Sequence, residues 1–159
     1  INIFKADLKK SQKEFGWNLL LNENDTISVD GNKIKVIGVE NWASSRFQQY
    51  GDLDKAYNGL DNEDFKILMT HNPSHWNAKV TDAYNDINLT LSGHTHGLQY
   101  GIDIGDFRVS PVRLAYKQWA DLYELNKQYI YVNRGFGFMG YPGRVGILPE
   151  ITILELKKS

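Results

Sequence analysis

Two short apolar segments, each followed by a histidine-bearing loop, constrain the fold of this chain most. Residues 65–69 and 87–91 are rich in side chains that suit buried strands, and the loops after them hold His71 and His94. Residues 73–80 lie between them and predict a helix with Pro73 in its first turn, where a missing N–H costs nothing. Strand, helix and strand in this order predict parallel neighbours in an α/β sheet, whose carboxyl ends meet at one edge.

All four histidines fall within 26 residues, at positions His71, His75, His94 and His96. Glycines bracket the loop Ser92-Gly93-His94-Thr95-His96-Gly97, and a glycine-bent backbone lets two imidazoles point into one cleft. Convergence of His71, His94 and His96 predicts a site for zinc, manganese or iron, which all accept imidazole. The alternative is a loop of hydrogen-bonding histidines without a metal. His75, inside the predicted helix, is expected to be a surface or capping residue.

The composition narrows the chemistry and the partners. The chain has no cysteine, so a metal must be bound by histidine, carboxylate, amide or backbone oxygen. The charges nearly cancel, 18 basic against 19 acidic, and no basic cluster favours nucleic acid. No apolar run approaches the roughly 20 residues that cross a bilayer. The absence of cysteine fits the cytoplasm, which is the predicted location.

The remaining pattern predicts a mixed sheet of about six or seven strands with two or three helices. We expect a helix at 4–15 stopped by Gly16, a hairpin at 27–39 turning at Asp30-Gly31-Asn32, a short helix at 53–57, a second hairpin at 123–132 turning at residues 126–128, and a final strand at 151–156. The segment 42–64 is polar and aromatic and is expected to lie outside the core. No linker or repeat divides the chain, so residues 1–159 are expected to belong to one domain.

Two stretches resemble the last two motifs of the calcineurin-like metallophosphoesterases. They are Ile67-Leu68-Met69-Thr70-His71-Asn72-Pro73 and Leu89-Thr90-Leu91-Ser92-Gly93-His94-Thr95-His96-Gly97. Ser110-Pro111, residues 119–123, Tyr131-Val132-Asn133-Arg134-Gly135 and residues 144–152 resemble the C-terminal part of a bacterial branch whose members are often tethered to the membrane. That branch usually has glycine where Asp121 stands, which leaves the local backbone conformation open.

The resemblance implies half of a four-layer α/β/β/α sandwich and a hydrolase of phosphomonoesters or phosphodiesters. It implies two divalent metal ions, manganese, iron or zinc, with His71 and His94 on one and His96 on the other. Two such cations neutralise phosphoryl oxygens and activate a water molecule. Arg134 or Arg144 is expected to bind the substrate phosphate and Asn133 to orient it. The alternative for these three is an ordinary surface loop.

The family's earlier motifs, Asp-x-His, Gly-Asp-x-x-Asp and Gly-Asn-His-Asp or Glu, are absent from this chain. Gly51-Asp52-Leu53-Asp54 has the wrong spacing and follows no apolar strand. We therefore expect the C-terminal portion of a phosphoesterase domain that has no catalytic residue of its own and is inactive alone. An upstream segment is expected to hold the other ligands and, by resemblance, a membrane anchor. The lone portion is expected to expose an apolar face, which favours self-association or a swapped dimer.

Two other functions stay open. One is a non-catalytic scaffold that binds a metal or a protein partner. The other is a carbohydrate-binding module, which would need at least two of Trp17, Trp42, Trp76 and Trp119 open on one face. Substrate preference is expected to come from residues 42–64 and from the loop 134–144. For the aromatic residues of that loop, Phe136, Phe138 and Tyr141, packing in the core is favoured over contact with a nucleoside or a lipid chain.

Overall fold

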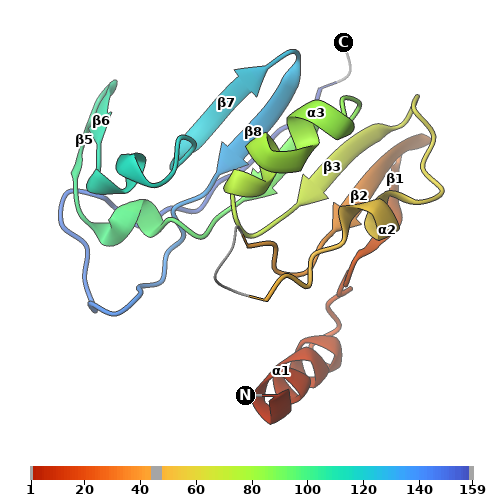
Figure 1. Ribbon diagram of the computed structural model, residues 1–159, viewed down its shortest axis with the longest axis horizontal. Coiled ribbons are helices and arrows are strands. Elements are labelled where there is room, and N and C mark those ends of the chain that lie inside the picture. The colour runs from red at the N-terminus through yellow and green to blue at the C-terminus, as the bar shows by residue number, and fades with distance from the viewer. Residues whose placement is uncertain (1, 44–47, 158–159) are drawn as a thin grey trace.

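The computed structural model describes residues 2–43 and 48–157. Its main sheet is mixed, with the strand order β1-β2-β3-β4-β8-β7, and a small antiparallel hairpin stands beside it (Figure 1). The strands of the main sheet are β1 (Glu23–Val29), β2 (Asn32–Gly38), β3 (Phe65–Met69), β4 (Leu89–Ser92), β7 (Asp121–Leu125) and β8 (Gln128–Val132). The small hairpin pairs β5 (Ile102–Ile104) with β6 (Phe107–Val109). The predicted α/β fold with a mixed sheet is confirmed.

Both predicted hairpins of the main sheet form with two-residue turns. Asp30 and Gly31 join β1 to β2 with φ angles of 50° and 77°, the left-handed pair that a tight hairpin requires. Asn126 and Lys127 join β7 to β8 in the same way, with φ angles of 52° and 65°. Gln128 is therefore the first residue of β8 and not part of the turn.

Four parallel strands, β2, β3, β4 and β8, form the centre of the sheet. The chain between β3 and β4 is helical from residue 74 to 83, immediately after Pro73. It contains one π-helical turn, Trp76–Val80, and α3, Thr81–Ala83. The predicted strand–helix–strand unit is thus confirmed, and the carboxyl ends of β3 and β4 lie at one edge, where the histidine loops begin.

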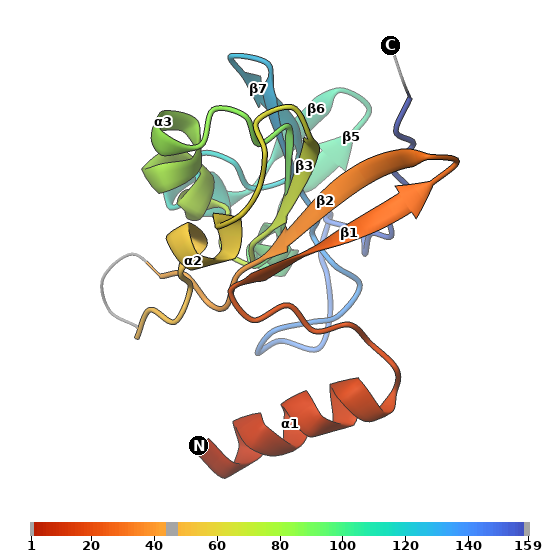
Figure 2. The same ribbon diagram turned by 90° about the vertical axis from the view of Figure 1, so that its right-hand side faces the viewer.

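Helices cover only one face of the main sheet. Figure 2 shows α2 (Leu53–Tyr57) and α3 on one side and the C-terminal segment on the other. The covered face holds the main core, whose fully buried members include Ile37, Leu68, Val80, Ile130 and Val132. The opposite face carries exposed apolar side chains from four strands, β1, β3, β7 and β8: Ile27, Val29, Phe65, Met69, Leu122 and Tyr129. We call it the open face.

The helix at the N-terminus, α1 (Asn2–Glu14), lies apart from the sheet in both views (Figures 1 and 2). It ends as predicted, because Gly16 adopts a φ of 78° and its N–H bonds to the carbonyl of Lys13. An ion pair of 2.7 Å between Lys9 and Glu40 joins it to the rest of the chain.

Two expectations about strands were wrong. Residues 151–156 form no strand, although their apolar residues alternate, and Ile151 and Ile153 are exposed. A period-2 pattern states which side chains share a face, but a strand also needs a neighbouring backbone to pair with. The β5–β6 hairpin was missed, because each of its strands has only three residues. The described residues therefore hold eight strands, six of them in the main sheet.

Candidate metal centre

Parallel pairing of β3 and β4 brings His71 and His94 together. Hydrogen bonds continue past the strand ends, from Thr70 N–H to the carbonyl of Leu91 (3.0 Å) and from Gly93 N–H to the carbonyl of His71 (3.1 Å). As a result Nδ1 of His94 lies 2.9 Å from Nε2 of His71, and the two rings meet edge to face. The two histidines thus converge, as the sequence predicted.

The geometry of this pair suits a shared cation. Two nitrogens on a tetrahedral zinc, with bonds of about 2.0–2.1 Å, lie about 3.3 Å apart, so the pair needs to open only slightly. Nε2 of His94 lies 2.8 Å from the hydroxyl of Tyr116, a contact that fixes the ring orientation. Burial and then the neighbouring imidazoles lower the pKa of His71, and burial and His96 lower the pKa of His94. Both shifts favour the neutral ring, which is the form that binds metals.

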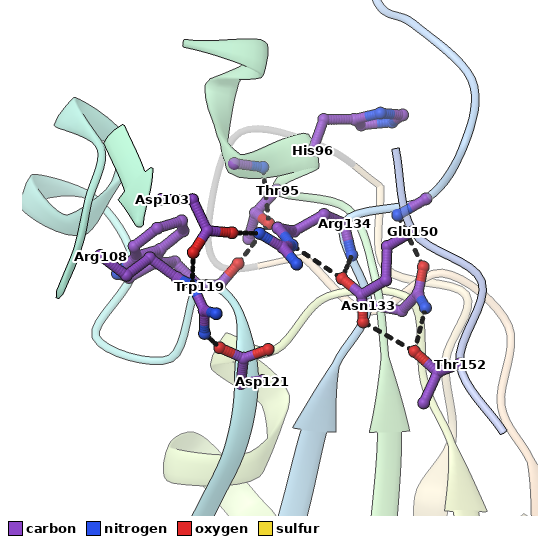
Figure 3. Close-up of polar contacts among 12 residues, drawn as sticks. Thr95, His96, Asp103, Arg108, Trp119, Asp121, Asn133, Arg134, Glu150 and Thr152 are labelled. Atoms are coloured by element: carbon purple, nitrogen blue, oxygen red, sulfur yellow. Dashed lines mark hydrogen bonds and ion pairs between the residues drawn. The ribbon is translucent and has the colours of Figure 1, made fainter. Parts of the chain in front are cut away.

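His96 does not join this pair. Its Nδ1 is buried without a hydrogen-bond partner, and its ring faces the backbone of Gly135, where an added Cβ would lie 4.0 Å from Cε1. Figure 3 shows the ring near the ion pairs of Arg134, with no hydrogen bond or ion pair between them. Across residues 2–43 and 48–157, no three His, Asp or Glu side chains come together as a metal-binding group. A buried ring nitrogen without a partner is costly, so this atom is suited to a ligand.

The loop that carries His94 and His96 has an unusual backbone. His94 has a φ of 72°, and four successive residues from His96 to Gln99 have φ angles between 50° and 57°. We expected the bracketing glycines to make the bend, yet the histidines share it. Left-handed φ angles in residues other than glycine cost about 1–3 kcal/mol each and concentrate at functional sites. The hydroxyl of Thr95 secures the loop by donating to the carbonyl of Trp119 at 2.7 Å.

His75 is not a surface residue, and although it stands at the N-cap of the π-helical turn, its side chain makes no capping hydrogen bond. Its ring is fully buried and stacks on Trp42 with centroids 4.8 Å apart. Its Nδ1 lies 3.0 Å from the hydroxyl of Thr70. Burial, and then the charge of Lys79, lowers the pKa of His75 to about 4. It is therefore a neutral core residue below the histidine loops.

Arg134 lies in a chain of ion pairs (Figure 3). Its Nε bonds to Glu150 at 2.7 Å, and its Nη1 bonds to Asp103. Asp103 also binds Arg108, which in turn pairs with Asp121. Burial disfavours the charge of Arg134, but Glu150 and Asp103 outweigh it and raise its pKa. Burial acts against the charge of Glu150 too, yet hydrogen bonds from Tyr131 and Arg134 hold its pKa at about 2.

The other two predicted substrate residues differ in how free they are. The amide of Asn133 donates to Thr152 at 2.9 Å and accepts from the N–H of Gly135 at 2.6 Å. Arg144 contacts no carboxylate of the described residues, and its guanidinium donates to the carbonyls of His96, Arg134, Gly135 and Gly137. Arg144 thus keeps an unneutralised positive charge beside His96, whereas Arg134 is paired with two carboxylates. No motif in the sequence predicted this difference.

Asp121 and the aspartates of the Gly-Asp-Leu-Asp segment have structural roles. Asp121 has a φ of 68°, so it adopts a conformation that glycine takes easily. Asp52 caps α2 by accepting from the N–H of Lys55, and Asp54 binds Tyr84 and Lys79. Neither aspartate lies in the histidine site, as the spacing predicted.

Three of the four tryptophans are buried, namely Trp42, Trp76 and Trp119, and Trp17 is exposed. A sugar-binding platform needs two open rings on one face, so these residues do not form one. No helix in the described ranges combines the length and the apolar character needed to cross a membrane.

The fold and the site define an α/β protein in which two histidines pair at the carboxyl edge of the main sheet. Comparison with known proteins identifies the family. The chain is 33% identical over 146 residues to the uncharacterized metallophosphoesterase YkuE of Bacillus subtilis. The matched segment covers 91% of this chain and 48% of YkuE. It is 34% identical to an uncharacterized metallophosphoesterase of Campylobacter jejuni, over 92% of this chain and 36% of the relative.

A transmembrane protein with metallophosphoesterase domain from Bos taurus is 32% identical, over 88% of this chain and 32% of its own length. The chain thus spans about half or less of the relatives it matches. No family model and no solved structure matches it. The chain belongs to the calcineurin-like metallophosphoesterase family.

Proposed function

We propose that this chain is the histidine-bearing C-terminal part of a metal-dependent phosphoesterase that hydrolyses phosphomonoesters or phosphodiesters at a two-metal centre. The observation that carries the proposal is the His71–His94 pair, 2.9 Å between ring nitrogens at the edge of β3 and β4. In this proposal His71 and His94 hold one metal, and His96 holds the second through a ring nitrogen. Manganese, iron and zinc all fit a site with imidazole ligands.

Each residue of the site has a distinct task. The metals would neutralise phosphoryl oxygens and lower the pKa of a bound water. Tyr116 fixes the ring of His94, and the unneutralised Arg144 binds the phosphate beside His96. Asn133 and Arg134 hold the loop to residues 150–152, and through it they place the phosphate site. The part of the chain that the structure describes places no bridging carboxylate at the pair, so in this proposal further ligands come from another segment, and residues 1–159 alone are inactive.

The open face supports a proposal about partners. Exposed apolar residues from four strands of one sheet share this face, and exposed apolar surfaces of this kind mark interfaces. In the whole protein we propose that a second layer of the sandwich covers it. The separate chain is expected to cover it by self-association or by a swapped dimer. The substrate is a phosphate ester, and the cytoplasm remains the proposed location, with membrane association through a further segment as its variant.

A non-catalytic scaffold is the second candidate. The observation that favours it is that the described residues bring together only two of the three predicted ligands. It predicts a complete protein that binds a partner and hydrolyses no ester with any metal.

The test compares the chain with the complete product of its gene on a chromogenic phosphodiester and a phosphomonoester with manganese. We expect only the complete product to hydrolyse the esters. Its His94→Ala variant should lose activity by at least about a hundredfold, because even changes to residues behind the metal ligands cost about 10–100-fold. The matched control is Lys33→Ala, an exposed residue at the start of β2, and a melting curve shows whether each variant is folded. A complete product that is inert with every metal leaves the scaffold as the remaining function.

A further inference from the structure

Residues 135–143 form an uncharged loop rich in aromatic side chains, which we call the aromatic loop. Phe136, Phe138 and Tyr141 are 78%, 64% and 63% exposed, so the expectation that they pack in the core was wrong. Met139 is exposed as well, and four of the nine residues are glycines. Large apolar side chains held in water are unfavourable, at about 25 cal/mol per Å² of exposed apolar surface. Such a surface is suited to binding an apolar group.

The aromatic loop is held in place by the side chain of Gln99. This side chain is buried, and its amide donates to the carbonyls of Tyr141 at 2.7 Å and Gly143 at 2.6 Å. Its oxygen accepts from the N–H of Met139. Three hydrogen bonds from one buried amide therefore fix the middle of the loop, while its aromatic rings stay in solvent.

The loop is also joined to the histidine site. Gln99 is the last residue of the left-handed run that begins at His96, so the strained backbone aims its side chain at the loop. Gly135, at the start of the loop, faces the ring of His96. Arg144, just after the loop, donates to the carbonyls of His96 and Gly137. The same short segment thus presents His96 on one side and supports the aromatic surface on the other.

We propose that the aromatic loop binds the organic group of the phosphoester and that Gln99 is the positioning residue that keeps it beside His96. This inference rests on the proposed function and adds a substrate class, esters that carry an aromatic or large apolar group. The loop has no charge to attract a second anionic group, and its rings offer flat faces for stacking. A surface fixed before binding loses little conformational entropy when the ligand arrives.

The test uses the complete gene product with two diesters that share a leaving group, phenyl p-nitrophenyl phosphate and methyl p-nitrophenyl phosphate. We expect wild type to prefer the phenyl ester in kcat/KM. The Phe136→Ala, Phe138→Ala double variant is expected to lower that preference about tenfold, or about 1.4 kcal/mol, through KM for the phenyl ester. Leu114→Ala, which removes an equally exposed apolar side chain outside the loop, is the matched control and should keep the preference.

Gln99→Leu tests the positioning role, because it keeps the size of the side chain and removes all three hydrogen bonds. We expect the same loss of preference and faster chymotrypsin cleavage after Phe136, Phe138 or Tyr141. We expect Gln99→Glu to lose the preference as well, because its carboxylate keeps the acceptor for Met139 but repels the carbonyls of Tyr141 and Gly143. Equal losses on both esters would overturn the positioning role.

The outcomes separate this inference from the proposed function. A wild type inert on both diesters and on a phosphomonoester refutes the phosphoesterase proposal and this assignment with it. If wild type hydrolyses phosphomonoesters only, phenyl phosphate and methyl phosphate replace the two diesters in the same comparison. An active wild type whose preference survives the double phenylalanine change refutes the aromatic loop alone. Because Phe136 and Phe138 are exposed, the double variant is expected to fold even where Gln99→Leu does not.

Discussion

The two faces of the main sheet differ sharply in cover although the same strands build both. In β3, Leu68 is fully buried under the helices, and the next residue, Met69, is 40% exposed on the open face. Across β8 and β7, Ile130 is fully buried and Leu122 is 55% exposed. Central parallel strands are apolar on both faces because both are normally covered. The strands therefore carry apolar side chains on both faces of the sheet, and the helices of the described residues cover one of these faces.

The largest expected effect contrasts the faces within one strand. Leu68→Ala should lower the free energy of unfolding of the chain by about 3.5 kcal/mol, because it removes buried atoms and leaves a cavity. Met69→Ala should lower it by less than about 1 kcal/mol, since that side chain is partly in water. Urea unfolding of both variants, at a protein concentration low enough to keep the chain monomeric, measures the two losses. Equal losses would mean that the open face is covered in solution as well as the helical face.

The second effect tests the helical face by pH. The unfolded chain protonates His75 below about pH 6.5, whereas folding holds its pKa at about 4. Its contribution to stability is therefore complete above pH 6.5 and is lost as the pH falls towards 4, by about 3 kcal/mol. Unfolding curves between pH 7 and 4 measure this slope.

His75→Phe is the control for that slope, because phenylalanine stays neutral at every pH and can still stack on Trp42. The other three histidines titrate in both proteins, so the difference between the two slopes belongs to His75. Identical slopes would show that folding leaves the pKa of His75 unchanged.

The smallest expected effect concerns the open face as an interface. Phe65→Lys should weaken self-association of the chain about tenfold or more, about 1.4 kcal/mol, because it places a charge within the apolar surface. Sedimentation velocity over a range of concentrations measures the association. Phe107→Lys, at a more exposed site on the β5–β6 hairpin, should leave it unchanged. A wild-type chain that is monomeric at every concentration would contradict the proposed interface.

The parts predicted best were those set by neighbouring residues. The Asp-Gly turn, the glycine stop after α1 and the strand–helix–strand unit depend on local backbone preferences, and all three were found. The meeting of His71 and His94 also followed, because parallel neighbours share one edge. The final strand at 151–156 was predicted wrongly, since pairing depends on a partner strand that local pattern does not specify.

The residues missed were those whose role depends on distant contacts. Nothing near Asp103 in the sequence pointed to Arg134, 31 residues away, nor did Gln99 point to the carbonyls of residues 141 and 143. The different states of Arg134 and Arg144 had the same origin, because two carboxylates from separate segments reach one and not the other. Pairing of this kind becomes visible only when the segments are folded together.

Periodicity, turn residues and short motifs were sufficient to predict the class of the fold, the family resemblance and the edge at which the histidines lie. Tertiary structure alone decided that His75 is a buried neutral residue, that His96 stands apart from the histidine pair, and that the aromatic loop faces solvent. The physical reason is that burial, charge pairing and strained φ angles are properties of the packed chain. They depend on which segments meet, and the order of residues does not state this directly.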